Sequence, residues 1–355
     1  MDETTFRILD TLSRALGRPL SINELTRRIE TLHGTADYKN IYEKLQTLNK
    51  DTIINLTKTG RSQITTLNFN NYLLIDLLAE TELRRKQDLL RNRRELQMFF
   101  LELDTYFNDP QFQFLQSISC ISPVKNIRLN RIEFLILLKG SRERITIKEL
   151  NAVHELIRLL QSIHNIKIDY LMLSKDEFID FLKSEETNPL REMLADKITF
   201  LYPQSFWLDI RSTLEKGIHI RIEQIATNPA KISEQDLVYN LARFGYREIG
   251  SELKQGKDIC IEYIITAILL RNRARRIEAI PIILAKNKSN YNLLIFLCQK
   301  YEVSSRLLGL LKILNKIKQA KETQGAIEIL QIRKIKEIKA NERSIRQKMR
   351  LYNVT

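Results

Sequence analysis

The first 69 residues most constrain the fold, because three helices and a hairpin follow one another with short connections. Apolar residues recur at helical spacing over residues 4–16, and Pro19 cannot continue that helix. Residues 21–24 read Ser-Ile-Asn-Glu, in which the Ser and the Glu satisfy each other's backbone N–H groups and start a second helix. We expect a third helix over residues 36–49, and then two β-rich runs within residues 52–67 that are joined by a Gly-containing turn.

This order of elements is typical of a winged helix-turn-helix. In that fold the third helix enters the major groove of DNA, and the hairpin touches the backbone or the minor groove. Lysine, asparagine and tyrosine on the outward face of the helix can reach base edges or phosphates. The predicted nucleic-acid-binding residues are Tyr38, Lys39, Asn40, Tyr42 and Lys44 on the helix, with Lys58 and Arg61 on the hairpin. A winged helix that binds only protein is the alternative.

Composition limits the partners and the compartment. A chain of 355 residues predicts two or three domains, and its formal charge of +14 favours a polyanion or an anionic membrane surface as partner. The longest apolar run, residues 263–270, is too short to span a bilayer, so we expect no membrane insertion. Asp2 and Glu3 precede an amphipathic helix, so we also expect no signal peptide. Cys120, Cys260 and Cys298 lie far apart, and the histidines lack metal-ligand spacing. We therefore expect a cytoplasmic protein without a metal site.

Residues 70–107 read as one long connecting helix, because glycine and proline are absent and apolar residues recur throughout. A basic cluster accompanies the apolar stripe. Its members include Arg84, Arg85, Lys86 and Arg91. This cluster either extends a DNA track or forms a solvated helix face that Glu80, Glu82 and Glu95 partly offset. A long helix after a winged domain commonly dimerises or acts as a strut, so a homodimer is an open expectation.

Residues 108–205 alternate between strand and helix patterns, which predicts an α/β domain. Strands are expected at 131–139 and 167–173, and a helix at 146–164 between them. Residues 114–122 read as a helix or a strand, and short helices are expected at 176–183 and 190–196.

The same region carries a resemblance. The strand Arg-Ile-Glu-Phe-Leu-Ile-Leu-Leu at 131–138, the strand at 168–174, Glu177-Phe178 and the Arg-Glu-Met-Leu run at 191–194 occur in the order seen in minimal nucleotidyltransferase domains. Over residues 1–205 the chain resembles archaeal-type proteins that fuse a winged helix-turn-helix to such a domain. The resemblance implies a Gly-Ser pair, an Asp-x-Asp strand and a third carboxylate, which together hold two Mg²⁺ ions on a nucleotide.

The chain departs from that catalytic pattern. The Asp-x-Asp position falls on Arg131-Ile132-Glu133, so Glu133 and Asp169 are the remaining candidate carboxylates. Arg131 places a cation where a metal ligand is needed, and residues 117–123 contain no glycine. We expect Arg131 to pair with one of the carboxylates. The domain is predicted to be catalytically inactive, without cofactor, and to serve as a scaffold, an interaction surface or a nucleotide sensor.

Residues 206–320 show only helical patterns and predict an interaction or dimerisation module. A second basic patch lies within it and consists of Arg271, Arg273, Arg275 and Arg276. Residues 321–355 read as a basic helix or a disordered basic arm, a pattern that favours non-specific phosphate contact.

Together these observations predict a multidomain α+β protein. Its parts are a winged helix-turn-helix at 1–69, a connecting helix at 70–107, a nucleotidyltransferase-like domain at 108–205, a helical domain at 206–320 and a basic tail. The predicted function is double-stranded DNA binding in transcription regulation. The alternatives are an active nucleotidyltransferase of the toxin–antitoxin kind and an RNA-associated adaptor.

Overall fold

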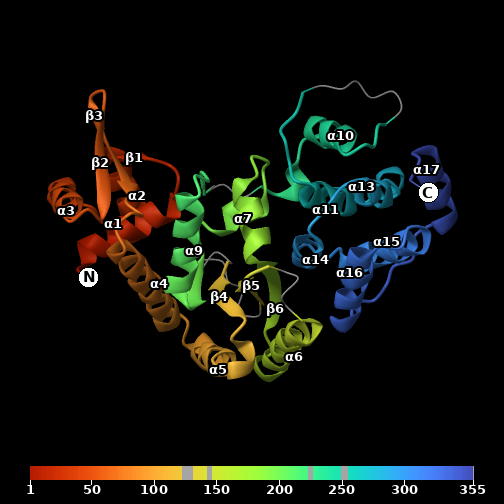
Figure 1. Cartoon of the computed structure of the whole chain (residues 1–355), viewed down its shortest axis with the longest axis horizontal. Coiled ribbons are helices and arrows are strands. Elements are labelled where there is room, and N and C mark those ends of the chain that lie inside the picture. The colour runs from red at the N-terminus through yellow and green to blue at the C-terminus, as the bar shows by residue number, and fades with distance from the viewer. Residues whose placement is uncertain (122–130, 142–145, 223–226, 249–254, 355) are drawn as a thin grey trace. The chain divides into compact units, whose positions relative to one another are not determined.

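The computed structural model describes residues 1–121, 131–141, 146–222, 227–248 and 255–354 (Figure 1). The protein contains both α and β structure, with many helices and two small sheets, as the helices and strands predicted from the sequence indicated. The chain forms two compact units. Unit 1 contains Met1–Lys183 and Leu190–Ala226, and unit 2 contains Ser184–Pro189 and Thr227–Thr355.

The N-terminal segment contains the expected helices and hairpin. Its elements are α1 (Glu3–Arg14), β1 (Leu20–Ser21), α2 (Ile22–His33), α3 (Tyr38–Lys50), β2 (Ile54–Thr59) and β3 (Ser62–Leu67). The three strands form an antiparallel sheet in the order β1-β3-β2. The Ser21 side chain accepts a hydrogen bond from the Glu24 N–H at the start of α2, and Gly34 ends that helix in the left-handed conformation, with φ +84°. The local sequence signals therefore act as predicted.

The predicted single helix at 70–107 is wrong, because the structure divides it. The helix α4 (Leu73–Asn92) ends at Arg93, whose backbone is not helical, and α5 (Gln97–Phe107) starts after a short 3₁₀ turn. The Gln97 side chain donates to the Leu90 carbonyl, which would otherwise lose its partner at the break. The break lets α5 direct Phe99 and Phe100 into the core of the larger sheet. No glycine or proline signalled this break.

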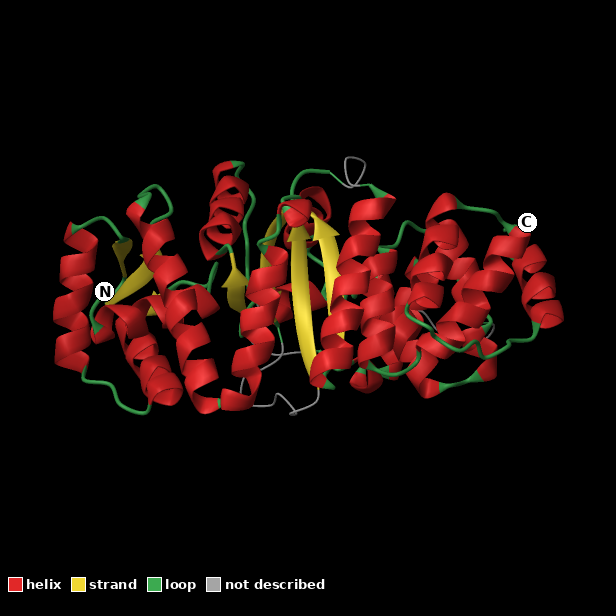
Figure 2. Ribbon diagram, turned by 90° about the horizontal axis from the view of Figure 1, so that it is seen from below, coloured by secondary structure: helices red, strands yellow, loops and turns green. Residues whose placement is uncertain are grey.

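The larger sheet has the strand order β6-β5-β4-β7. Its strands are β4 (Leu115–Cys120), β5 (Arg131–Leu138), β6 (Lys167–Ser174) and β7 (Ile198–Leu201). Only β5 and β6 run parallel, and they are connected through α6 (Ile147–His164), whose Thr146–Glu149 capping box marks its start. Helices α5 and α6 cover one face, while α7 (Lys175–Lys183) and α9 (Pro203–Glu215) lie on the other (Figures 1 and 2).

Two features of this layer differ from expectation. The strand β7 was not predicted, because its run Ile-Thr-Phe-Leu is short and follows a helix without a turn signal. Helix α9 was placed in the helical domain by its sequence, but it packs on α4 and belongs to unit 1. A short helix, α8 (Pro189–Met193), precedes β7.

Unit 2 is helical in the part that the structure describes, apart from a bridge between Thr187 and Ile259. Its helices are α10 (Glu234–Arg243), α11 (Ile261–Arg271), α12 (Ala274–Ile277), α13 (Ile280–Lys286), α14 (Tyr291–Lys300), α15 (Ser304–Ile317), α16 (Lys321–Ile332) and α17 (Glu342–Leu351). Glu278 and Ala279 separate α12 from α13, and Pro281 stands in the first turn of α13, where its missing N–H costs nothing. The C-terminal region is folded rather than a free arm, because Leu330, Ile345 and Met349 are buried.

No helix in the described residues has the length and apolarity needed to cross a bilayer.

Candidate nucleic-acid interface

The outward face of α3 carries the predicted recognition residues. Ile41, Leu45 and Leu48 anchor the helix in the core, which leaves its opposite face to solvent. Exposed on that face are Tyr38, Lys39, Asn40 and Tyr42. The rings of Tyr38 and Tyr42 stack with centroids 6.3 Å apart. The structure thus brings a lysine, an amide and an aromatic pair onto one helix face, a set of groups able to contact bases and phosphates.

The hairpin of β2 and β3 supplies the second part of the predicted interface. Thr59 pairs with Ser62 across a turn in which Gly60 has φ +60°, as the Gly-containing turn predicted. Lys58 and Arg61 are exposed, and neither forms an ion pair with a described residue. The hairpin is joined to α3 because the Asn49 side chain accepts a hydrogen bond of 3.0 Å from the Leu56 N–H.

Lys44 differs from the other predicted contacts. Its ammonium lies 2.8 Å from Asp2 Oδ2 and is only partly exposed, so its charge is already compensated within the N-terminal segment. We therefore leave Lys44 out of the candidate interface.

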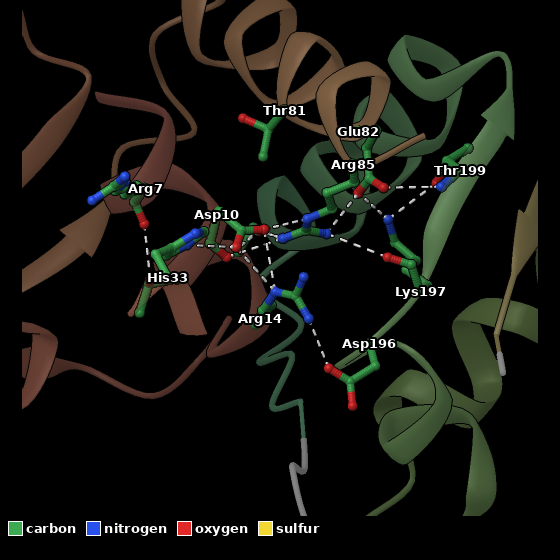
Figure 3. Close-up of polar contacts among 12 residues, drawn as sticks. Arg7, Asp10, Arg14, His33, Thr81, Glu82, Arg85, Asp196, Lys197 and Thr199 are labelled. Carbon is green, nitrogen blue, oxygen red and sulfur yellow. Dashed lines mark hydrogen bonds and ion pairs between the residues drawn. The ribbon is translucent and has the colours of Figure 1, made fainter. Parts of the chain in front are cut away.

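The first predicted basic patch is largely internal, and Arg85 is the clearest correction. Its side chain is buried rather than on a solvated face, and its guanidinium donates to the Asp10 carboxylate, to Ser13 Oγ at 2.7 Å and to the Lys197 carbonyl at 3.3 Å (Figure 3). Glu82, also predicted on the solvated face, is fully buried beside it.

The rest of this buried cluster links three elements. The Lys197 ammonium donates to Glu82 and to Thr199 Oγ1 at 3.1 Å, and it lies 3.9 Å from the centre of the Phe206 ring. The Thr199 N–H donates to the second Glu82 oxygen at 2.9 Å (Figure 3). Asp10, Glu82, Arg85 and Lys197 therefore join α1 to α4 and to the start of β7. We call these four residues the buried ionic cluster.

Ionisation in this cluster follows from burial and charge. Burial alone would raise the pKa of Asp10, but Arg85, His33 and Arg14 outweigh it and hold that pKa well below its usual range. Burial lowers the pKa of Lys197 to about 8, against the opposing attraction of Glu82. The two carboxylates thus depend on the two cations for their stability in the interior.

The residues on either side of Arg85 in the sequence also form ion pairs within unit 1. Arg84 lies 3.1 Å from Glu80 and over the Phe6 ring, and Lys86 lies 2.5 Å from Asp104. Only Arg91 of the four predicted residues is strongly exposed, at 76%, with Asp88 at 3.6 Å. Of the four residues predicted to extend the DNA-binding surface along α4, only Arg91 therefore remains available for such a contact.

The second predicted basic patch is similarly compensated. Arg276 is buried and donates to both Glu234 and Glu248, while Arg271 and Arg273 lie 3.0 Å and 3.3 Å from Glu234. Hydrogen bonding from Arg276 lowers the pKa of Glu234. Arg275 is exposed. The Glu234 carboxylate thus pairs with three of the four arginines and connects the start of α10 with residues 271–276.

Of the two candidate catalytic carboxylates, Asp169 forms an ion pair with Arg131. Glu133 and Asp169 are opposite residues on the parallel strands β5 and β6. Both Nε and Nη2 of Arg131 lie 2.7 Å from Asp169 Oδ2, which confirms the expected pairing of Arg131 with a carboxylate. The pair sits near the amino ends of these strands, whereas open α/β sheets bind ligands at the carboxyl ends. In the described residues, no group of three or more acidic, histidine or cysteine side chains could hold a metal ion.

Cys120, Cys260 and Cys298 are all buried, as expected from their apolar surroundings. Burial raises the pKa values of Cys260 and Cys298, so neither is an activated nucleophile.

The buried ionic cluster was missed by the sequence analysis, although the sequence holds a signal. Asp10 follows Phe6 at helical spacing on the apolar face of α1. Glu82 and Arg85 likewise fall between Leu78 and Leu89 on the apolar stripe of α4. Charged residues at positions that the period assigns to the core indicate a buried pair. Comparison of the chain with protein-family models, with curated proteins and with solved structures finds no match.

Proposed function

We propose that this protein binds duplex DNA through α3 and the β2–β3 hairpin and acts as a transcription regulator. In this proposal the N-terminal segment is a winged helix-turn-helix. The α/β layer resembles a nucleotidyltransferase and serves as a scaffold without catalysis.

One observation carries the proposal: the exposed cations of α3 and its hairpin form no ion pair with the described residues, whereas most cations of the two predicted basic patches at 84–91 and 271–276 pair with carboxylates. Lys39, Lys58 and Arg61 are exposed and form no ion pair with the described residues. In contrast, Arg85 and Arg276 are buried and paired with carboxylates. A recognition helix needs its outward side chains uncommitted, because each base or phosphate contact replaces hydration by a new hydrogen bond.

Removal of Lys39 and Arg61 should affect binding in two different ways. Lys39→Ala is expected to weaken the preferred site by about 1–3 kcal/mol and to relax the sequence preference, because a contact to a base edge is lost. Arg61→Ala is expected to weaken all duplexes alike and to flatten the salt dependence by about one unit of slope, because a phosphate contact is lost. Selection of a preferred site, followed by fluorescence anisotropy at several salt concentrations, measures both.

Arg27→Ala is the matched control, since Arg27 is an exposed arginine of the N-terminal segment that lies on α2 rather than on α3 or the hairpin. It should leave the preference and the slope nearly unchanged. Equal losses in Arg27→Ala and Arg61→Ala would remove the hairpin from the interface. A protein that binds single-stranded RNA more tightly than any duplex would favour an RNA-associated adaptor instead.

The scaffold role has its own test. Incubation with labelled nucleoside triphosphates and Mg²⁺ should give no transfer of label, because Arg131 occupies the carboxylate that a metal ion needs. Transfer that disappears in Glu133→Gln would identify an active nucleotidyltransferase and contradict the proposal.

A further inference from the structure

Residues 334–350, which we call the basic strap, are bound to the surface of unit 2. The Ile338 N–H donates to the Ser305 carbonyl at 3.0 Å, at the start of α15. At Gly309 of α15 an added Cβ would lie 2.1 Å from the Ile338 carbonyl oxygen, so only glycine permits this approach. Farther along the strap, Ile345 and Met349 on one side of α17 are buried. The strap is therefore held in place along its length.

The acidic side chains of the strap form ion pairs, two of them with lysines of α15. Glu337 lies 2.5 Å from Lys312, and Glu342 lies 3.1 Å from Lys316 and 2.8 Å from Arg346. Five cations of the strap remain exposed without an ion pair to any described residue. They are Lys334, Lys336, Lys339, Arg343 and Arg350. The surface that the strap presents to solvent is thus strongly positive, with its own carboxylates neutralised.

The chemistry of this surface fits a phosphate backbone better than a membrane. A helix that binds a membrane surface inserts a free apolar face into the lipid. Most of the apolar face of α17 is occupied, because Ile345 and Met349 are fully buried, and the exposed apolar residue of this helix is Leu351 at its end. A row of unpaired lysine and arginine side chains instead matches the regular negative charge of a nucleic-acid backbone, which is bound through release of counterions.

We propose that the basic strap is a second DNA-binding surface, which contacts the phosphate backbone of the duplex without reading its sequence. This inference rests on the proposed function for the identity of the polyanion, but it uses a separate set of residues in the other compact unit. Linking two surfaces in one chain raises the effective concentration of the second once the first is bound. Each weak contact then adds to the overall affinity.

The test is a salt titration of the full chain with a labelled duplex, using the triple variant Lys334→Ala, Lys336→Ala and Lys339→Ala. Each neutralised phosphate contributes a slope of about 0.9, so loss of three contacts should flatten the slope by about 2–3 units. Between roughly 50 and 200 mM salt, wild-type affinity should then fall about 40-fold more than that of the variant. The melting temperature should stay unchanged, since these lysines are exposed and unpaired.

A matched control removes three other exposed lysines of unit 2. Lys231→Ala, Lys257→Ala and Lys288→Ala together change the net charge equally and should keep a slope close to that of wild type. Equal flattening in both triple variants would overturn the proposal, because the effect would then come from total charge alone. The proposal would also be overturned if the strap variant lost binding to phosphatidylserine vesicles without any change in duplex binding.

The N-terminal double variant Lys39→Ala and Arg61→Ala separates this inference from the proposed function. Flattening in the strap variant with no effect of the N-terminal variant supports the strap and contradicts the α3 interface. Flattening in the N-terminal variant with no effect of the strap variant contradicts the strap proposal and supports the α3 interface. If wild-type protein binds no duplex even at low salt, both proposals fall.

Discussion

Arg85→Met should destabilise unit 1 by roughly 3–5 kcal/mol, the largest loss expected from any single change considered. The substitution keeps most of the buried volume but removes the guanidinium that pairs with Asp10 and Glu82. Glu82 would then keep only Lys197 as a cationic partner, and Asp10 would keep Arg14 at 3.2 Å. Urea unfolding, followed by the fluorescence of Trp207, a buried residue of α9, measures the loss.

Two further variants isolate the cause. Arg91→Met removes an exposed arginine of the same helix and should change the stability by less than about 0.5 kcal/mol. Combining Arg85→Met with Asp10→Asn removes the carboxylate that loses its guanidinium partner, while Glu82 keeps Lys197, and should recover a large part of the loss. A double variant less stable than Arg85→Met alone would show that the cost arises from lost packing and hydrogen bonds rather than from buried charge.

The second large effect concerns pH and Glu262, at the start of α11 in unit 2. This side chain is buried, and one of its oxygens accepts a 2.7 Å hydrogen bond from the Asn290 N–H. Burial raises the pKa of Glu262 from 4.5 to about 7, and the negative charge of Glu186 acts in the same direction. The Asn290 N–H opposes this shift only in part. Folding therefore favours the protonated carboxyl group.

The sign of the pH dependence follows from this shift. Below pH 4.5 the carboxyl group is protonated in both the folded and the unfolded chain, so its contribution to stability is fully present. As the pH rises from 4.5 to about 7, only the unfolded chain releases the proton, and stability falls by about 3 kcal/mol. Glu262→Gln should abolish this fall and be more stable than wild type at pH 8, while both are similar at pH 5.

Glu328→Gln is the matched control, because Glu328 is an exposed carboxylate of α16 in the same unit. It should retain the full pH dependence of wild type. Thermal unfolding at several pH values between 5 and 8 measures all three proteins. If Glu262→Gln and wild type lose the same stability over this range, the dependence belongs to another group.

Local signals predicted much of the fold. The capping residue Ser21 and the turn at Gly60 each gave the expected element, because their effects act within a few residues. The buried strand at 131–138 and the pairing of Arg131 with a carboxylate also followed from the residues themselves. The outward positions of Lys39 and Asn40 on α3 follow from helical period alone.

The remaining features depend on contacts between distant residues. Arg85 and Arg276 look like solvated cations in the sequence, and only the folded chain brings Asp10, Glu234 and Glu248 to them. Likewise β7 is short, and it forms a strand because it pairs with β4, nearly 80 residues earlier. A count of basic residues therefore overstates the area available to DNA, since it does not show which charges the fold has already compensated.

The path of the chain limits how the two units can be separated. After α7 the backbone enters unit 2 for residues Ser184–Pro189, returns to unit 1, and enters unit 2 again at Thr227. Within unit 2, the Cys260 N–H donates to the Thr187 carbonyl at 3.1 Å, and Arg243 pairs with Glu186. A fragment that begins at residue 227 would lack this backbone partner and this carboxylate. The chain thus crosses between the two units three times, and unit 2 is assembled from two separate stretches of the sequence.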